Sequence, residues 1–177
     1  IVVEKPSELE MILQESVKLG IKPGIGVRLR LSTLGAGKWQ NSGGDKAKFG
    51  LSPRQVLTLV EKLRESGHLD CLQLLHFHMG SQISNLRDIA AGMREAVRYF
   101  VELSKAGCNI RYMDSGGGLG VDYEGTRSRG SCSTNYRMEQ FAHTLIQPLQ
   151  EACAQYGLAE PRMITEAGRA MTAHHAM

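Results

Sequence analysis

The sequence predicts an α/β protein built on a parallel sheet, and two observations support this fold class. Four stretches carry apolar residues at the spacing of amphipathic helices, and each is followed by a short apolar run of strand length. Each helical stretch also closes at a glycine suited to a left-handed C-cap, namely Gly20, Gly67, Gly107 and Gly157. Strict alternation of strand and helix implies right-handed crossovers and therefore parallel strands. A doubly wound sheet and a (β/α)8 barrel both satisfy this pattern.

The elements follow in chain order. The expected strands are residues 1–3, 25–31, 72–78, 110–114 and 162–165. Two helices are expected to begin at capping boxes, Ser7 with Glu10 and Ser52 with Gln55, and Pro53 occupies a favoured first helical position. The four apolar helix faces are Leu9, Ile12 and Leu13; Val56, Val60 and Leu63; Ile89, Met93, Val97 and Phe100; and Phe141, Leu145, Leu149 and Cys153.

Length and composition narrow the class of protein. The 177 residues suit one domain, and because the chain begins without methionine we expect a segment of a longer protein. No apolar run approaches the length of a membrane span, and a net charge of +3 with dispersed basic residues does not indicate nucleic-acid binding. The four cysteines form no C-x-x-C pair, so neither zinc nor a redox dithiol is predicted, and a reducing, cytoplasmic location is expected. Small-molecule chemistry is the favoured function.

Polar residues gather where three of the predicted strands end. The three stretches are "LLHFHMGSQ" at 74–82, "MDSGGGLG" at 113–120 and "ITEAGR" at 164–169. In both candidate folds functional residues collect past the carboxyl ends of the strands. Each stretch also has a structural interpretation: core histidines, a plain glycine turn and an ion pair of Glu166 with Arg169. The more specific hypothesis is that all three stretches contribute residues to one functional site.

The glycine run at 116–118 suits a phosphate, because consecutive glycines let backbone N–H groups approach an anion closely. The dinucleotide pattern G-x-G-x-x-G fails, since it needs glycine at Val121 when started from Gly116 and at Tyr123 when started from Gly118. The lysine of the Walker motif is also missing. The pattern therefore favours a phosphate that belongs to a cofactor other than a nucleotide.

"HFHMGSQ", "DSGGGLG" and "TEAGR", in this order, resemble the strand-end motifs of the alanine-racemase-like, pyridoxal-phosphate-dependent decarboxylases. "GAGKWQNSGGDKAKFGL", "LLHFHMGSQ", "GGGLGVDYEGTRS" and "AHH" resemble the biosynthetic arginine decarboxylase branch over essentially the whole chain. The resemblance implies part of a (β/α)8 barrel, about its second half. Residues 1–177 would then be a partial cofactor-binding domain that lacks the first barrel strands and the C-terminal β domain.

The resemblance also implies a function. It is the decarboxylation of L-arginine to agmatine and CO2 with pyridoxal phosphate, a first step towards polyamines such as spermidine, by a homo-oligomeric enzyme. The alternatives are a decarboxylase of diaminopimelate, lysine or ornithine, and a noncatalytic relative that binds a partner. Mg²⁺ is expected only because of the resemblance. No metal ligands are predicted from the residues themselves, and the two histidines at 174–175 lack the spacing of a zinc-binding helix.

Site residues follow from the same resemblance. His78 would stack on the cofactor ring, Ser81 would bind the phosphate, and Glu166 would pair with the pyridine nitrogen and strengthen the ring as an electron sink. The other phosphate-binding residues would be Gly116, Gly117, Gly118, Gly168 and Arg169. Further candidates are Arg28, Lys38 and Lys48, whereas His76 matches no motif and is expected to pack. The family's Schiff-base lysine has no counterpart here, so the isolated segment is expected to be inactive.

Overall fold

The computed structural model describes residues 1–33 and 48–173, so Lys38 and the histidines at 174–175 lie outside the described residues. In chain order the elements are β1 (Val2–Val3), α1 (Pro6–Leu19), β2 (Ile25–Arg28), α2 (Pro53–Glu65), the 3-10 turn η2 (Leu69–Cys71), β3 (Leu72–His76), α3 (Leu86–Lys105), β4 (Tyr112–Asp114), α4 (Met138–Tyr156), β5 (Arg162–Ile164) and α5 (Gly168–Thr172). The strand–helix alternation predicted from the sequence is confirmed.

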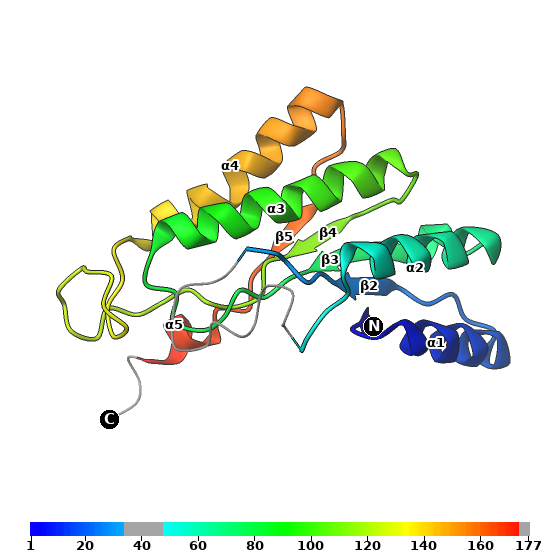
Figure 1. Cartoon of the computed structure of the whole chain (residues 1–177), viewed down its shortest axis with the longest axis horizontal. Helices are drawn as coiled ribbons and strands as arrows, with labels where there is room; N and C mark the ends of the chain where they lie inside the picture. Colours follow the sequence, from blue (N-terminus) through cyan, green and yellow to red (C-terminus); the bar gives the residue numbers. More distant parts are fainter. Residues whose placement is uncertain (34–47, 174–177) are drawn as a thin grey trace.

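The five strands form one sheet in the order β1-β2-β3-β4-β5, and every neighbouring pair is parallel. Since consecutive strands are neighbours and crossovers are right-handed, the connecting helices lie on the same face of the sheet. α3 and α4 pack side by side on that face, and the segments that follow the strands gather near α5 (Figure 1). This end of the sheet therefore carries the residues that the strand-end motifs supply.

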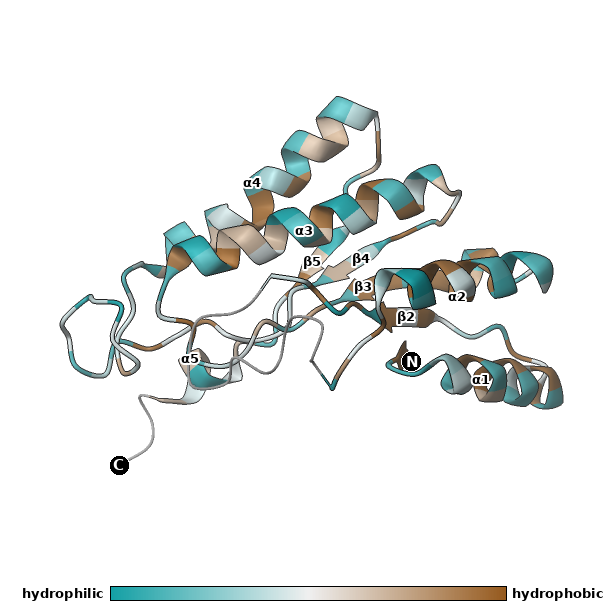
Figure 2. Cartoon of the chain, viewed as in Figure 1, coloured by the Kyte–Doolittle hydropathy of each residue, from teal (hydrophilic) through white to brown (hydrophobic). Residues whose placement is uncertain are grey.

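The core lies between the sheet and the apolar helix faces. β2 and β3 are strongly hydrophobic (Figure 2), and Val27, Leu72 and Leu75 are completely buried. The predicted faces of α2, α3 and α4 are buried along their whole length. On the predicted face of α1, Leu9 is buried, whereas Ile12 and Leu13 are partly buried. Among the described residues no helix combines the length and the apolar character needed to cross a bilayer.

Local signals set the start of α2 as predicted. The Ser52 hydroxyl accepts a hydrogen bond from the Gln55 backbone N–H at 3.4 Å, and the Gln55 side chain accepts one from the Ser52 N–H at 2.9 Å. At the other end, the glycines predicted to close the helices all have positive φ, from 63° at Gly20 to 90° at Gly107. These boundaries are confirmed because both signals act within one helical turn.

The predicted capping box of the first helix is wrong. The helix begins at Pro6, one residue before Ser7, because proline has no N–H to satisfy and a backbone angle suited to the first helical position. The Glu8 carboxylate turns back and accepts hydrogen bonds from the N–H groups of Glu4 at 2.7 Å and Lys5 at 3.0 Å. Glu8 thus performs the capping that the sequence analysis had assigned to Ser7 and Glu10.

The strands are shorter than predicted. β2 ends at Arg28 and β3 at His76, although Leu31 and Phe77 beyond them remain buried. The remaining strands are Val2–Val3, Tyr112–Asp114 and Arg162–Ile164, each shorter than its predicted run. An apolar run indicates burial, and in β2 and β3 the buried chain continues past the last residue of the strand. His78 consequently lies in the loop after β3.

Candidate functional site

Polar side chains form a row where the strands end. Arg28 of β2 is in register with His76 of β3, which is in register with Asp114 of β4. Residues paired in register across a parallel sheet project from the same face, so these three side chains share one side of the sheet. The Arg28 guanidinium donates to the carboxylate of Glu4, the residue that follows β1, and lies 4.9 Å from the centre of the Phe49 ring. Arg28, a predicted candidate, is thus held within this row.

His76 and Asp114 form a buried pair. Their side chains meet at 3.1 Å between His76 Nδ1 and Asp114 Oδ2, with 8% and 7% of the two residues exposed. The other Asp114 oxygen accepts a hydrogen bond from the Gly116 N–H at 2.9 Å. Burial by itself raises the pKa of Asp114, but the hydrogen bonds from His76 and Gly116 outweigh it, and the pKa lies below its ordinary value. His76 is buried as predicted, yet it also binds a carboxylate that the sequence analysis did not single out.

His78 lies in the loop after β3 with a fixed ring. Its Nδ1 accepts a hydrogen bond from the Gly117 N–H at 3.2 Å, so the neutral ring carries its proton on Nε2. Burial lowers the pKa of His78, and the positive charge of Arg28 and the neighbouring His76 lower it further. The structure therefore favours the neutral imidazole.

The three consecutive glycines allow the loop after β4 to lie against the loops after β3 and β5. A Cβ on Gly116 would lie 2.6 Å from the Phe77 carbonyl oxygen, and one on Gly117 would lie 2.9 Å from the Glu166 carbonyl oxygen. Gly118 has a φ of +108°, and its Cβ would meet the Gly80 carbonyl oxygen at 2.8 Å. Any side chain here would separate the loops, so glycine is required by the backbone contacts themselves.

Arg169, in α5, joins two of the strand-end loops. Its Nε and Nη2 donate to the Ser81 hydroxyl at 3.3 and 3.1 Å, and its Nη1 donates to the Tyr123 hydroxyl at 3.4 Å. Ser81 and Arg169 were predicted to act together, and the structure brings them into contact. Tyr123 was missed, although it belongs to the same "GGGLGVDYEG" motif as the glycines.

A cavity of about 230 Å³ lies at these strand ends. Its lining residues are His78, Ser81, Gln82, Gly117, Gly118, Leu119, Glu166, Ala167, Gly168 and Arg169. Seven of the predicted site residues are thus brought together, while Gly116 and Arg28 lie outside the lining. Gln82 was missed; its side-chain amide binds both the N–H and the carbonyl of Val121, at 2.9 and 2.6 Å, and so ties the first loop to the second. A guanidinium, a hydroxyl, an imidazole and a carboxylate face one space.

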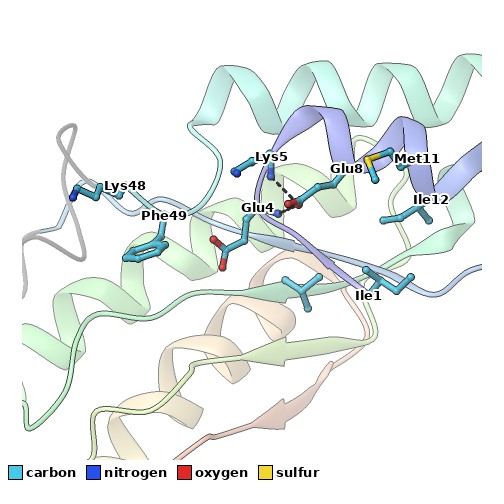
Figure 3. Close-up of a pocket in the computed structure, with 9 residues that line it drawn as sticks. Ile1, Glu4, Lys5, Glu8, Met11, Ile12, Lys48 and Phe49 are labelled. Carbon is cyan, nitrogen blue, oxygen red and sulfur yellow. Dashed lines mark hydrogen bonds between the residues drawn. The ribbon is translucent and has the colours of Figure 1, made fainter.

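A larger cavity of about 620 Å³ lies beside the edge strand β1, and Figure 3 shows residues that line it. Its Glu8 carboxylate is already used by the backbone N–H groups of Glu4 and Lys5 at the start of α1 (Figure 3). Glu4 in turn pairs with Arg28. Lys48, a predicted candidate, lines this cavity and not the smaller one. Because these carboxylates are engaged locally, the smaller cavity is the candidate site.

Three side chains at the edge of the candidate site could hold a cation. One ligand atom each of His76, Asp114 and Glu166 lies within 4.8 Å of the other two. The Asp114 carboxylate, however, is already occupied by His76 and the Gly116 N–H. Mg²⁺ prefers a shell of oxygen ligands, of which this group supplies only part, so Mg²⁺ stays a prediction from the resemblance.

Fold and site together define a class: a parallel α/β sheet whose strand-end loops line one cavity, arranged as part of a (β/α)8 barrel. The chain belongs to the pyridoxal-dependent decarboxylases, whose family description "Pyridoxal-dependent decarboxylase, pyridoxal binding domain" matches residues 1–173. The family named from the strand-end motifs is therefore confirmed, and the doubly wound alternative is excluded.

Individual relatives support the same family assignment. The chain is 66% identical over all 177 residues to the biosynthetic arginine decarboxylase of Xanthomonas campestris pv. campestris, of which it covers 28%. Among solved structures it resembles the biosynthetic arginine decarboxylase SpeA of Campylobacter jejuni, with a TM-score of 0.78 and 30% identity over 95% of this chain and 26% of that one. Diaminopimelate decarboxylase from Helicobacter pylori, complexed with L-lysine, follows with a TM-score of 0.75 and 25% identity over 93% of this chain and 38% of that one. The chain thus spans about a quarter of the length of arginine decarboxylase relatives.

Proposed function

We propose that the protein containing this chain decarboxylates L-arginine to agmatine and CO2 with pyridoxal phosphate, as the first step of a route to polyamines such as spermidine. The observation that carries the proposal is the 66% identity, over all 177 residues, to the biosynthetic arginine decarboxylase of Xanthomonas campestris. Diaminopimelate decarboxylases share the fold at much lower identity, for example 25% for the Helicobacter pylori enzyme.

The small cavity fits the phosphate of this cofactor at one end. The Arg169 guanidinium and the Ser81 hydroxyl already meet there, and a guanidinium is well suited to bind a phosphate. Gly117 and Gly118 line the same cavity, and a Cβ at either position would collide with a neighbouring loop. We assign Ser81, Gly117, Gly118, Gly168 and Arg169 to the phosphate. Gly116, whose N–H is used by Asp114, would only shape the glycine turn beside it.

The same cavity also offers groups that suit the cofactor ring. His78 offers a neutral imidazole, fixed by the Gly117 N–H, on which a heteroaromatic ring can stack. The exposed Glu166 carboxylate lines the same cavity, and there it would hold a proton on the ring nitrogen. When bound, pyridoxal phosphate supplies an electron sink for the electron pair that remains as CO2 leaves. Glu166 would strengthen that sink.

This chain would supply only part of the active site. The lysine that binds the cofactor covalently is proposed to lie elsewhere in the complete protein, as is the β domain. We further propose that the complete protein is a homo-oligomer located in the cytoplasm. Arg28 is assigned a supporting role beneath the cavity, because it pairs with Glu4 and lowers the pKa of His78.

The assignment of arginine as the substrate is tested with the complete protein and pyridoxal phosphate. The assay compares arginine, lysine, ornithine and diaminopimelate, each labelled at the carboxyl carbon. We expect kcat/KM for arginine to exceed that for the other three substrates, with agmatine as the amine product. A higher kcat/KM for any of the others would replace arginine by that substrate. Bound cofactor without CO2 release from all four would support the noncatalytic alternative instead.

A further inference from the structure

The Glu166 side chain of the candidate site lies beside two buried polar side chains, Asp114 and His76. Glu166 lines the cavity, and directly beside it lies the buried Asp114, with one ligand atom each of Glu166, Asp114 and His76 within 4.8 Å of the other two. Asp114 is fixed from two sides, by His76 Nδ1 at 3.1 Å and by the Gly116 N–H at 2.9 Å. A buried carboxylate held in this way keeps its position and its charge.

We propose that Asp114, held by His76, acts on the site through Glu166: it places a permanent negative charge directly behind the Glu166 carboxyl group. The inference rests on the proposed function, because it concerns the proton that Glu166 would hold on the ring nitrogen of pyridoxal phosphate. A second anion nearby favours the protonated nitrogen, so Asp114 extends the protonated form to higher pH.

The charged groups around Asp114 support this role. On β3 and its following loop lie His76 and His78, on β2 lies Arg28, and after β5 lies Glu166. The Arg28 guanidinium is already paired with the Glu4 carboxylate. Burial raises the pKa of Asp114, but its hydrogen bonds with His76 and Gly116 outweigh burial, and the pKa lies below its ordinary value. Asp114 therefore stays ionised throughout the neutral range.

The test uses the complete protein loaded with pyridoxal phosphate that is ¹⁵N-labelled at the ring nitrogen. The ¹⁵N chemical shift, followed by solid-state NMR against pH, reports whether that nitrogen carries a proton. In Asp114→Asn the side chain keeps its shape and can still accept the Gly116 hydrogen bond. We expect the midpoint for loss of the proton to fall by about one pH unit or more, as for removal of a nearby charge.

His76→Gln provides a second variant, which leaves the Asp114 charge but removes its anchor. We expect a smaller downward shift of the same midpoint and a broadened ¹⁵N signal, because the Asp114 charge is less firmly positioned. The matched control is Asp70→Asn, which removes an exposed carboxylate paired with Lys22 just before β3, and it should leave the midpoint unchanged.

A midpoint in Asp114→Asn equal to that of the wild type would overturn the proposal. So would equal downward shifts in Asp114→Asn and Asp70→Asn, since these would reflect net charge alone. If Asp114→Asn does not fold, an unchanged midpoint and linewidth in His76→Gln would overturn it. Failure of the proposed function looks different: the wild type would then bind no pyridoxal phosphate or release no CO2 from arginine.

Discussion

Gly117→Ala should weaken both the fold and cofactor binding. Gly117 does not need a left-handed backbone, so the effect of alanine comes from space alone. The added Cβ would lie 2.9 Å from the Glu166 carbonyl oxygen, whereas ordinary contacts begin at 3.4 Å, and the two loops must therefore separate by about 0.5 Å. The hydrogen bond from the Glu166 N–H to the Gly116 carbonyl, 2.8 Å long, resists that movement.

Overpacking of a rigid contact of this kind costs about 1–3 kcal/mol in the free energy of unfolding. The same displacement moves Glu166 away from the cavity and disturbs the Gly117 N–H that holds the His78 ring, so we expect the dissociation constant of pyridoxal phosphate to rise about tenfold, which corresponds to roughly 1.4 kcal/mol. Urea unfolding gives the first quantity, and fluorescence titration of the complete protein with the cofactor gives the second.

Gly24→Ala is the matched control, because Gly24 has no atom within 4 Å of its added Cβ and lies before β2, at the opposite end of the sheet. It should leave the unfolding free energy and the cofactor affinity within error or raise stability slightly. If Gly117→Ala behaves like Gly24→Ala in both measurements, the close contact with the Glu166 carbonyl does not shape the site.

Two further predictions follow from burial, charge and strand edges. The pKa of His78 in the folded chain lies below its ordinary value of 6.5, so on acidification the unfolded chain takes up this proton first. The free energy of unfolding, measured with urea, should therefore fall as the pH drops below about 6.5, and His78→Gln should reduce the steepness of this fall. An unchanged pH dependence in His78→Gln would contradict the assignment. The isolated 177 residues should aggregate and release no CO2 from arginine. In the part of the chain that the structure describes, the outer edges of β1 and β5 have no strand partner, and Val2 and Ile164 are 41% and 36% exposed. Light scattering and a CO2 assay test this, and a monomeric, active segment would refute it.

The fold was largely predictable because its signals are local. Helical spacing of apolar residues, glycine caps and the Ser52 capping box each act within a few residues, and the structure confirms them. The start of the first helix was predicted wrongly because two overlapping signals compete there, and Pro6 with Glu8 prevails over Ser7 with Glu10. Strand ends were overestimated because apolar residues such as Leu31 and Phe77 stay buried beyond the last residues of the strands.

Site residues that belong to a strand-end motif could be predicted from the sequence, whereas contacts that depend on the register of the strands could not. His78, Ser81 and Arg169 stand out beside glycines, and the structure brings them to one cavity. The pairing of His76 with Asp114 depends on β3 and β4 being aligned in a particular register, which no local pattern in the sequence specifies. The choice between a doubly wound sheet and a barrel required the family motifs, since both folds share the same strand and helix periodicity.

The central claim is that this cavity serves pyridoxal phosphate in a decarboxylation, and Glu166→Ala in the complete protein tests it most directly. Release of CO2 from carboxyl-labelled L-arginine is measured at equal cofactor occupancy for the wild type, for Glu166→Ala and for Glu160→Ala, a control at an exposed carboxylate just before β5. We predict that Glu166→Ala still binds the cofactor but loses CO2 release by orders of magnitude, while Glu160→Ala matches the wild type. Activity of Glu166→Ala within a few-fold of the wild type would contradict the account.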